Sequence, residues 1–166
     1  MFENKPISLK DLRHILQKFK LNNVKVDLFK NFETFDKDNI ILIQSDINPK
    51  EGHYVCMFKD KNGRINYFDP SGFKPLQLFK KYKIDINYQN PNKFYYYLIT
   101  NNDLIDYNKF NLQKNKDSST CALWCIYRLL NKDLNNDEFI YYIKKIKKQY
   151  NIDNYDDLII NIMNLY

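Results

Sequence analysis

This chain of 166 residues has little cysteine and no long apolar run, and both shortages narrow what the protein can be. It contains three cysteines, an odd number that argues against a framework of disulfide bonds. No stretch approaches the roughly 18 consecutive apolar residues that a membrane-spanning helix needs. The first residues also lack the charged end and apolar run of a signal peptide, so we expect a soluble, non-secreted protein in a reducing compartment.

Glycine and histidine are also scarce, which limits where special backbone geometry and acid–base chemistry can lie. All three glycines fall between residues 51 and 72. Of the two histidines, His14 lies on the flank of an amphipathic helix, where a surface role is expected, whereas His53 directly follows Gly52 at the start of a strand-like run. Because no repeat, flexible linker or low-complexity tail occurs, we expect residues 1–166 to form a single domain.

Hydrophobic residues and positive charge, by contrast, are plentiful. With 44% hydrophobic residues the chain can bury a substantial core. The formal net charge of +6 favours acidic partners, nucleic acid above all. The abundance of Asn, Lys, Ile and Tyr, which an A/T-rich genome would produce through codon use, offers a second explanation of the same charge.

The order of the expected elements is helix, then strands, then helices. Apolar residues recur at helical spacing from Leu9 to Phe19 and again from Cys121 onward, whereas the runs between them suit strands. The expected strands are 39–45, 53–60, 64–70, 93–100 and 108–113, and the expected helices are 8–21, 74–83, 121–131, 136–150 and 154–165. This order predicts an α+β domain with helices packed against a mostly antiparallel central sheet.

The stretch SSTCALWCIY, residues 118–127, places two of the three cysteines four residues apart at the start of an expected helix. Ser119 or Thr120 would be the N-cap of that helix. The positive end of the helix dipole and the free amide groups there stabilise a thiolate, which makes Cys121 a candidate nucleophile. Cys125 lies one turn further along and is expected to be a core residue.

A thiolate nucleophile needs a base and an acceptor that orients the base, and the expected hairpin carries both. Asp69 lies at the end of the strand that pairs with the strand of His53. A two-residue turn at Asn62-Gly63 would put Asp69 on the opposite face of the sheet from His53. We therefore predict either a three-residue loop at 61–63, with Gly63 in a bulge, or an Asp69 that lies beyond the end of the ladder.

Gln113 completes an ordered set of four residues. It precedes Cys121 by eight positions, and its side-chain amide and the Cys121 backbone N–H are candidate donors to an oxyanion. The set His53, Asp69, Gln113 and Cys121, in the segments GHYVCMF, YFDPSGF, LQ and SSTCALWCIY, resembles the adenain-like cysteine proteases. This family comprises the adenovirus maturation protease and its relatives in large DNA viruses, virophages and polinton-like elements, with SUMO and ubiquitin-like proteases as more distant kin. The resemblance covers nearly the whole chain.

The resemblance implies a papain-like, adenain-like architecture and a role for each of the four residues. Cys121 corresponds to the nucleophile, His53 to the base, Asp69 to the acid that orients the base, and Gln113 to the oxyanion donor. The implied function is that of a thiol endopeptidase. Such an enzyme cleaves viral capsid or core precursor proteins during virion maturation, through an acyl-enzyme on Cys121.

Three further positions bear on this resemblance. Tyr54 matches an aromatic residue, often tryptophan, that follows the histidine in the family; it would cover the imidazolium face or simply pack within its strand. Ala122 stands where many relatives have glycine, which makes the backbone beside the nucleophile tighter. The orienting acid, Asp69, is one methylene shorter than the glutamate of the adenovirus enzymes, so the hairpin has to hold it closer to His53.

The resemblance also implies partners and a location. No metal or other cofactor is required for the chemistry, and relatives favour small residues, especially glycine, next to the cut. The resemblance makes DNA a candidate activator, because the adenovirus enzyme uses DNA as a cofactor. A lysine cluster would serve DNA here, although a solvated helix face explains it equally well: Lys144, Lys145, Lys147 and Lys148. We expect a monomer with no membrane partner, in the virion and in the viral factory of the host-cell cytoplasm.

Other interpretations remain open. A zinc-binding structural module would draw on His53, Cys56, Cys121 and Cys125, but residues 53 and 56 of one strand point to opposite faces. A protein of the same fold could be a deubiquitinase, a SUMO-like protease or an acetyltransferase, although a chain this short has no dedicated segment for an acyl-CoA. A virion structural protein with a dead site is disfavoured, because all four candidate catalytic residues are present.

Overall fold

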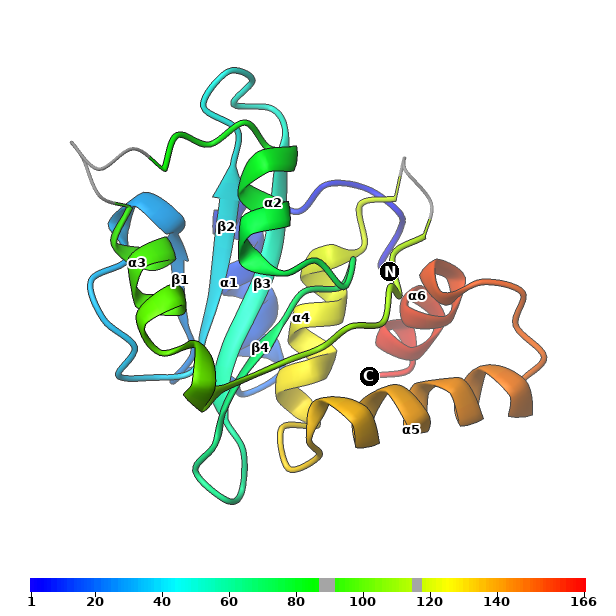
Figure 1. The fold of residues 1–166 in the computed structure, drawn as a ribbon. Coiled ribbons are helices and arrows are strands. Elements are labelled where there is room, and N and C mark those ends of the chain that lie inside the picture. The colour runs from blue at the N-terminus through cyan, green and yellow to red at the C-terminus, as the bar shows by residue number, and fades with distance from the viewer. Residues whose placement is uncertain (87–91, 115–117) are drawn as a thin grey trace.

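The sheet at the centre of the computed structural model has five strands in the order β1-β2-β3-β4-β5 (Figure 1). The structure describes residues 1–86, 92–114 and 118–166. The strands are β1 (Lys25–Leu28), β2 (Asn39–Gln44), β3 (Gly52–Lys59), β4 (Ile65–Phe68) and β5 (Ile105–Tyr107). Strand β3 pairs antiparallel with β2 and β4, whereas β1 runs parallel to β2 and β5 runs parallel to β4.

The sheet is therefore mixed, which corrects the expectation of a mostly antiparallel one. The two outer pairings are parallel because each is joined by a crossover connection rather than by a tight turn. The connection from β1 to β2 contains the 3-10 turn η1 (Phe29–Asn31), and the connection from β4 to β5 contains the helices α2 and α3. Only the central hairpins, β2–β3 and β3–β4, keep the antiparallel geometry that was predicted.

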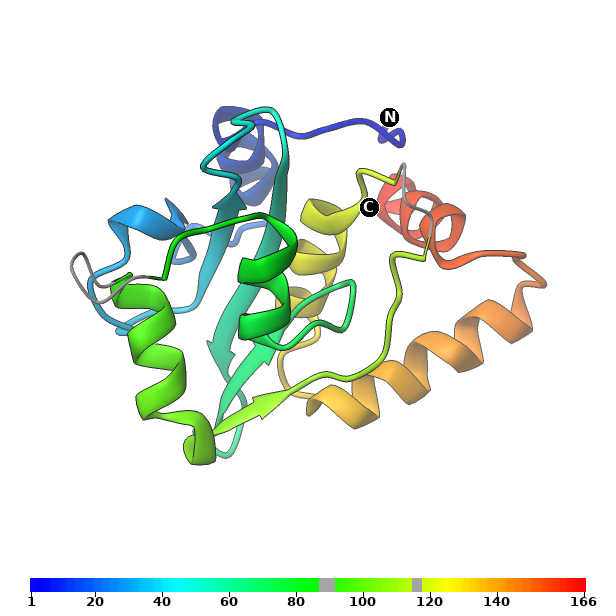
Figure 2. The ribbon, with the colours of Figure 1, turned by 45° about the horizontal axis from the view of Figure 1, so that its top comes forward.

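Helices cover both faces of the sheet, so the predicted α+β architecture is confirmed (Figure 2). They are α1 (Leu9–Lys18), α2 (Pro75–Lys81), α3 (Lys93–Thr100), α4 (Cys121–Leu130), α5 (Asn136–Gln149) and α6 (Tyr155–Leu165), with a second 3-10 turn, η2 (Asn102–Leu104). On one face η1, α2 and α3 build a core around Phe79 and Phe94. On the other, α1 and α4 lie with α5 and α6 around Trp124. No helix within the described ranges combines the length and apolar character of a membrane span.

Residues 93–100 form helix α3, although their aromatic and branched side chains predicted a strand. The side chain of Asn92 begins the helix by accepting a hydrogen bond of 3.0 Å from a backbone N–H of the first turn. Phe94 and Leu98, four residues apart, are both buried, and the Phe94 ring packs edge-on against Phe79. Burial along one helical stripe, together with the cap, therefore outweighs the strand propensity.

Residues 108–113 were also predicted to be a strand, and this prediction is wrong. The strand in this region is the short β5, which ends just before them. Beyond it, the backbone N–H groups of Leu112 and Gln113 both donate to the carbonyl oxygen of Pro70, at 2.8 and 3.0 Å. These two bonds give the backbone N–H groups their acceptors without pairing in a sheet. They also place Gln113 beside the loop that follows Asp69.

The hairpin of β3 and β4 has the three-residue loop that was predicted. Asp60 pairs with the residue after the loop through a backbone hydrogen bond of 3.0 Å, which leaves residues 61–63 as the loop. Gly63 has a φ of +77° and donates its N–H to the Asp60 carbonyl at 2.9 Å. In this register His53 and Asp69 belong to the same face of the sheet, as was predicted for the pair.

Gly63 and Gly72 offer a matched pair for a test of stability, since both have positive φ, +77° and +70°. A Cβ atom at Gly63 would meet nothing within 4 Å, whereas one at Gly72 would lie 2.9 Å from the carbonyl carbon of Phe110. We expect Gly63→Ala to lower the free energy of unfolding by about 1 kcal/mol, and Gly72→Ala by about 3 kcal/mol because the backbone at Phe110 must move. Equilibrium denaturation measures both, and equal losses would contradict the steric argument.

Candidate active site

His53 and Asp69 form a buried hydrogen-bonded pair at one end of the sheet. His53 is the second residue of β3, and Asp69 is the first residue after β4. The Nε2 atom of the His53 ring lies 2.7 Å from Oδ1 of Asp69. The side chains are 3% and 0% exposed, so bulk water does not weaken the interaction. The structure thus brings this predicted pair together.

Asp69 is held in place by its backbone as well as by its carboxylate. The side chain of Asn108 accepts a hydrogen bond of 2.7 Å from the Asp69 N–H and donates one of 2.6 Å to the Asp69 carbonyl. Because Asn108 directly follows β5, its amide continues the β4–β5 pairing beyond the last ladder residues. The N–H of Ser71 donates to Oδ1 at 2.7 Å, while the buried Oδ2 has no hydrogen-bond partner among the described residues.

The pKa of His53 reflects opposing influences. Burial lowers it, because the charged ring loses its hydration, whereas the charge and hydrogen bond of Asp69, and then those of Cys121, raise it. The net effect raises the pKa of His53 from 6.5 to about 10. Since Asp69 engages Nε2, the ring nitrogen available for the interaction with Cys121 is Nδ1. The raised pKa favours the charged form of the ring, which lies between Asp69 and Cys121.

Cys121 is the first residue of α4, where the sequence placed the candidate nucleophile. The N-cap is Thr120, but its side chain makes no capping hydrogen bond, so the first amide groups of α4 are left for the site. Cys121 is 8% exposed and borders a cleft, whereas Cys125, one turn on, is fully buried. Burial, followed by a hydrogen bond to Cys56, raises the pKa of Cys125. The prediction that Cys125 is a core residue is confirmed.

Gln113 borders the same cleft as Cys121 and His53. Its Nε2 atom donates a hydrogen bond of 2.6 Å to the carbonyl oxygen of Ser118. This partner fixes which end of the amide is nitrogen, since the opposite assignment would set two oxygens against each other. A primary amide carries two N–H groups, so one remains after Ser118 is satisfied. The Oε1 atom of Gln113 is buried and unpartnered among the described residues.

An aspartate of the last helix holds the segment that precedes Cys121. The Oδ1 atom of Asp156, in the first turn of α6, accepts hydrogen bonds from the hydroxyls of Ser118 and Thr120, both at 2.5 Å. Ser118 is also the residue whose carbonyl binds Gln113. Asp156 was absent from the sites expected from the sequence, as was Asn108, although both hold segments that carry predicted site residues.

The aromatic ring that stacks on His53 is Tyr82, at the end of α2, and not Tyr54. The His53 and Tyr82 ring centres are 6.0 Å apart and their planes differ by 16°. Burial, and then the negative charges of Cys121 and Asp69, raise the pKa of Tyr82. Tyr54 packs in the core of the other face and donates its hydroxyl to the Ile7 carbonyl at 2.9 Å. Of the two roles expected for Tyr54, covering the imidazolium or packing within its strand, the structure shows the second.

The site opens on a cleft of about 1070 Å³, slightly above the usual range for small-molecule pockets. Residues 6–9 of the N-terminal segment line one part of it, and Tyr82 lines another. The N-terminal segment is anchored beside the nucleophile, because Oδ1 of Asn4 accepts a hydrogen bond of 2.7 Å from the Ser119 N–H. The cleft therefore lies between the N-terminal segment, the end of α2 and the start of α4.

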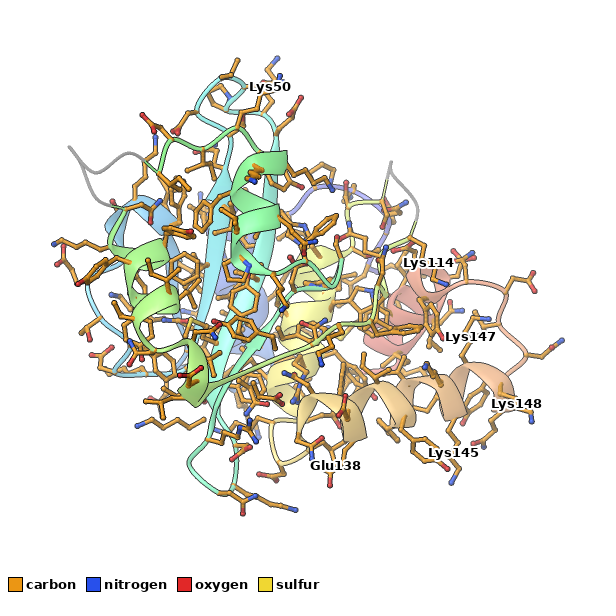
Figure 3. The ribbon with its side chains drawn as sticks, in the orientation of Figure 1. Lys50, Lys114, Glu138, Lys145, Lys147 and Lys148 are labelled. Carbon is orange, nitrogen blue, oxygen red and sulfur yellow. The ribbon has the colours of Figure 1, made fainter. Side chains whose placement is uncertain are left out.

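The lysines predicted to serve DNA do not all lie on one side of α5. Nζ of Lys144 lies 4.2 Å from the ring centre of Phe110, and Nζ of Lys147 lies 5.5 Å from that of Tyr155, which belongs to α6. Lys145 projects from the opposite side of α5 to Lys147 (Figure 3). The four lysines are close in sequence, but the helix directs their side chains to different sides, so they do not form one cluster. Contact with DNA remains a prediction.

The zinc alternative finds no support in the geometry. Cys56 is buried in the core that contains Trp124, while the His53 side chain faces Asp69 and Tyr82. Residues 53 and 56 of β3 thus alternate to opposite faces, as expected. Across residues 1–86, 92–114 and 118–166, no group of three or more His, Cys, Asp or Glu side chains is placed to hold a metal ion.

Comparison with known proteins gives one informative match. The chain is 33% identical over 107 residues to a protein of the Sputnik virophage described as uncharacterized protein V9. The match covers 61% of this chain and 60% of the virophage protein, so the chain spans less than two thirds of that relative. No family model matches the sequence. The similarity supports a viral origin for the chain and indicates no protease family.

Proposed function

We propose that this protein, with its similarity to a virophage protein, is a cysteine endopeptidase of the adenain-like kind. One observation carries the proposal: a cysteine at an uncapped helix N-terminus, a buried histidine cation and an acid that orients the histidine converge beside one cleft. The raised pKa of His53 favours the imidazolium at neutral pH, and a cation beside Cys121 is the arrangement that activates a cysteine nucleophile.

In the proposed reaction the Cys121 thiolate attacks the carbonyl carbon of the scissile peptide bond, which forms a C–S bond and an oxyanion. The oxyanion accepts hydrogen bonds from the Cys121 backbone N–H and from the Gln113 N–H that Ser118 leaves unused. His53 gives its Nδ1 proton to the leaving amine as the C–N bond breaks. Neutral His53 then takes a proton from water, whose oxygen attacks the thioester carbon and displaces the thiolate.

The proposed substrates are viral capsid or core precursor proteins, cleaved during virion maturation. The viral relative favours a viral substrate, and the size of the cleft favours an extended polypeptide. The proposed chemistry uses side chains and one backbone N–H of this chain. We propose that the chain acts as one domain and as a monomer, with DNA as a candidate activator. The expected place of action is the virion and the host-cell cytoplasm.

Cleavage mapping tests this function. The protein is incubated with purified virion precursor proteins, and new N-termini are identified by mass spectrometry. We expect a small set of cleavage sites, which disappear when the protein is first alkylated with iodoacetamide. Parallel incubations with C-terminally extended ubiquitin-like proteins and with acetyl-CoA plus a lysine-rich protein separate the deubiquitinase, SUMO-protease and acetyltransferase alternatives. A protein whose Cys121 is reactive but which produces no new terminus in any precursor would contradict the proposal.

A further inference from the structure

We propose that Asp156 is a positioning residue for the oxyanion hole, a role that rests on the proposed thiol acyl transfer. Asp156 does not belong to the set of residues that line the cleft. It acts through Ser118 and Thr120, whose hydroxyls both donate to its Oδ1 atom at 2.5 Å. The two hydroxyls belong to the segment that leads into α4 and its first residue, Cys121.

Asp156 is the shared acceptor in a cluster of three side chains, its own and those of Ser118 and Thr120. The Ser118 and Thr120 hydroxyl oxygens also lie 2.9 Å from each other, so the cluster has three oxygen–oxygen contacts, two of them to the carboxylate. Two hydroxyls supply only two hydrogens, so both are directed to the carboxylate oxygen, where the contacts are shortest. Distances of 2.5 Å are typical of hydroxyl groups bonded to an ionised carboxylate, the stronger class of hydrogen bond.

The position of Asp156 explains how a nearly buried carboxylate is tolerated there. The residue is 7% exposed, and no Lys or Arg of the described residues forms an ion pair with it. It lies in the first turn of α6, where the positive end of the helix dipole favours a negative charge. The hydroxyl groups of Ser118 and Thr120 donate hydrogen bonds to the carboxylate in place of water. An acid so placed serves the segment before Cys121 rather than a surface salt bridge.

Both proposed oxyanion donors depend on the residues that Asp156 holds. The Ser118 carbonyl accepts the hydrogen bond of 2.6 Å that orients the Gln113 amide. Thr120 is the N-cap of α4, so its position sets the direction of the Cys121 backbone N–H. Displacement of the segment would therefore move both donors together, while the contact of His53 with Asp69 would stay as it is.

Two small reagents separate the oxyanion hole from the thiolate. With 4-nitrophenyl acetate the thiolate sulfur bonds to the acetyl carbon, an oxyanion forms, and 4-nitrophenolate leaves with the electron pair of the broken C–O bond. With iodoacetamide the sulfur displaces iodide from a CH₂ carbon, and no oxyanion forms. The ratio of the two rate constants at Cys121, read by peptide mass spectrometry, therefore reports the oxyanion donors independently of thiolate formation.

In Asp156→Ala we expect acetylation of Cys121 to fall about 10- to 100-fold while alkylation at the same pH stays within twofold of wild type. Asp156→Asn keeps an acceptor oxygen and should recover part of the acetylation rate. The matched controls are Asp157→Ala and Asp157→Asn, since Asp157 is the exposed neighbour in the same helical turn. Both controls should match wild type.

An unchanged ratio in Asp156→Ala would overturn the proposal, and so would an equal fall in both rates, which would indicate a general loss of structure. If Asp156→Ala does not fold, Ser118→Ala and Thr120→Val each remove one of the two hydroxyls, and each should lower the ratio. The readout needs only Cys121 and two reagents. Failure of the wild-type protein to cleave any precursor would therefore count against the proposed function and leave this result standing.

Discussion

In Cys121→Ala, peptide hydrolysis is expected to fall by about 10⁴-fold or more, because no acyl-enzyme can form without the sulfur. The rest of the site should stay in place, since the side chain is small and its loss does not touch the bond between His53 and Asp69. The measurement is the initial rate of cleavage of a precursor protein that the wild-type protein cuts. Hydrolysis that persists in this variant would contradict the assignment of the nucleophile.

Cys125→Ala is the matched control, because it removes the same atom one turn further along α4. Cys125 is fully buried and hydrogen-bonded to Cys56, so its loss leaves a cavity in the core. We expect kcat/KM to stay within a few-fold of wild type, while the free energy of unfolding falls by about 1–2 kcal/mol. The two variants thus separate chemistry from stability. A loss of hydrolysis in Cys125→Ala without a loss of stability would mean that the wrong cysteine was chosen.

The second large effect is expected in His53→Ala, where alkylation of Cys121 at pH 6.5 should slow about a hundredfold. An unassisted cysteine thiol has a pKa near ~8.5, so about 1% of it is thiolate at that pH. In the wild-type protein the His53 cation stabilises the thiolate, and Cys121 should react fastest of the three cysteines below pH 7. Peptide mass spectrometry after timed iodoacetamide treatment gives the rate at each cysteine.

The pH dependence of this rate follows from the sign of the His53 shift. The pKa of His53 is raised to about 10, so the ring stays charged below that pH and loses its charge as the pH rises through it. The advantage of wild type over His53→Ala should therefore be large near pH 6.5. It should shrink as the pH rises through ~8.5, where the unassisted thiol of the variant ionises by itself, and should be gone by about pH 10, where His53 also loses its charge. His14→Ala is the control, because that ring is exposed and its hydrogen bond within the described part of the chain is to the Lys10 carbonyl. Equal rates for wild type and His53→Ala at pH 6.5 would mean that no thiolate–imidazolium pair forms.

The parts of the site that follow from local rules could be predicted from the sequence. Strand side chains alternate, so the pairing of His53 with Asp69 predicted either an odd loop or an Asp69 beyond the end of the ladder. The structure has an odd loop at residues 61–63, and Asp69 lies one residue past the last ladder pair. A cysteine after small hydroxyl residues and before an apolar helical run indicated a nucleophile at a helix N-terminus, and Cys121 begins α4. In both cases the local secondary structure, the alternation of a strand or the start of a helix, decides where the side chain lies.

The parts that depend on contacts between distant segments could not be predicted in this way. Helix α3 was mistaken for a strand because its aromatic residues suit either state, and only burial against α2 decides between them. Asn108 looked like the first residue of a strand, yet its side chain takes over the ladder bonds to Asp69.

The position of Asp156 in the sequence is unusual for an acidic residue. It lies three residues before Ile159 and seven before Met163, both buried, so helical spacing places this acid on the apolar stripe of α6. Asp157, one residue on, is exposed. A carboxylate on a buried stripe needs partners, and the hydroxyls that supply them are those of Ser118 and Thr120. The sequence could therefore have identified Asp156 as unusual, but not what it binds.

The spatial order of the strands repeats their order along the chain, β1 to β5. On a ribosome that adds about 5–20 residues per second, each new strand finds its neighbour already synthesised, and the longest wait is that of β4 for β5, across α2 and α3. Cys121 and α6 emerge after the last strand. We therefore expect the nucleophile to appear only when the sheet that carries His53 and Asp69 has formed, so a nascent chain would hold no competent thiol while its own strands are still open to attack.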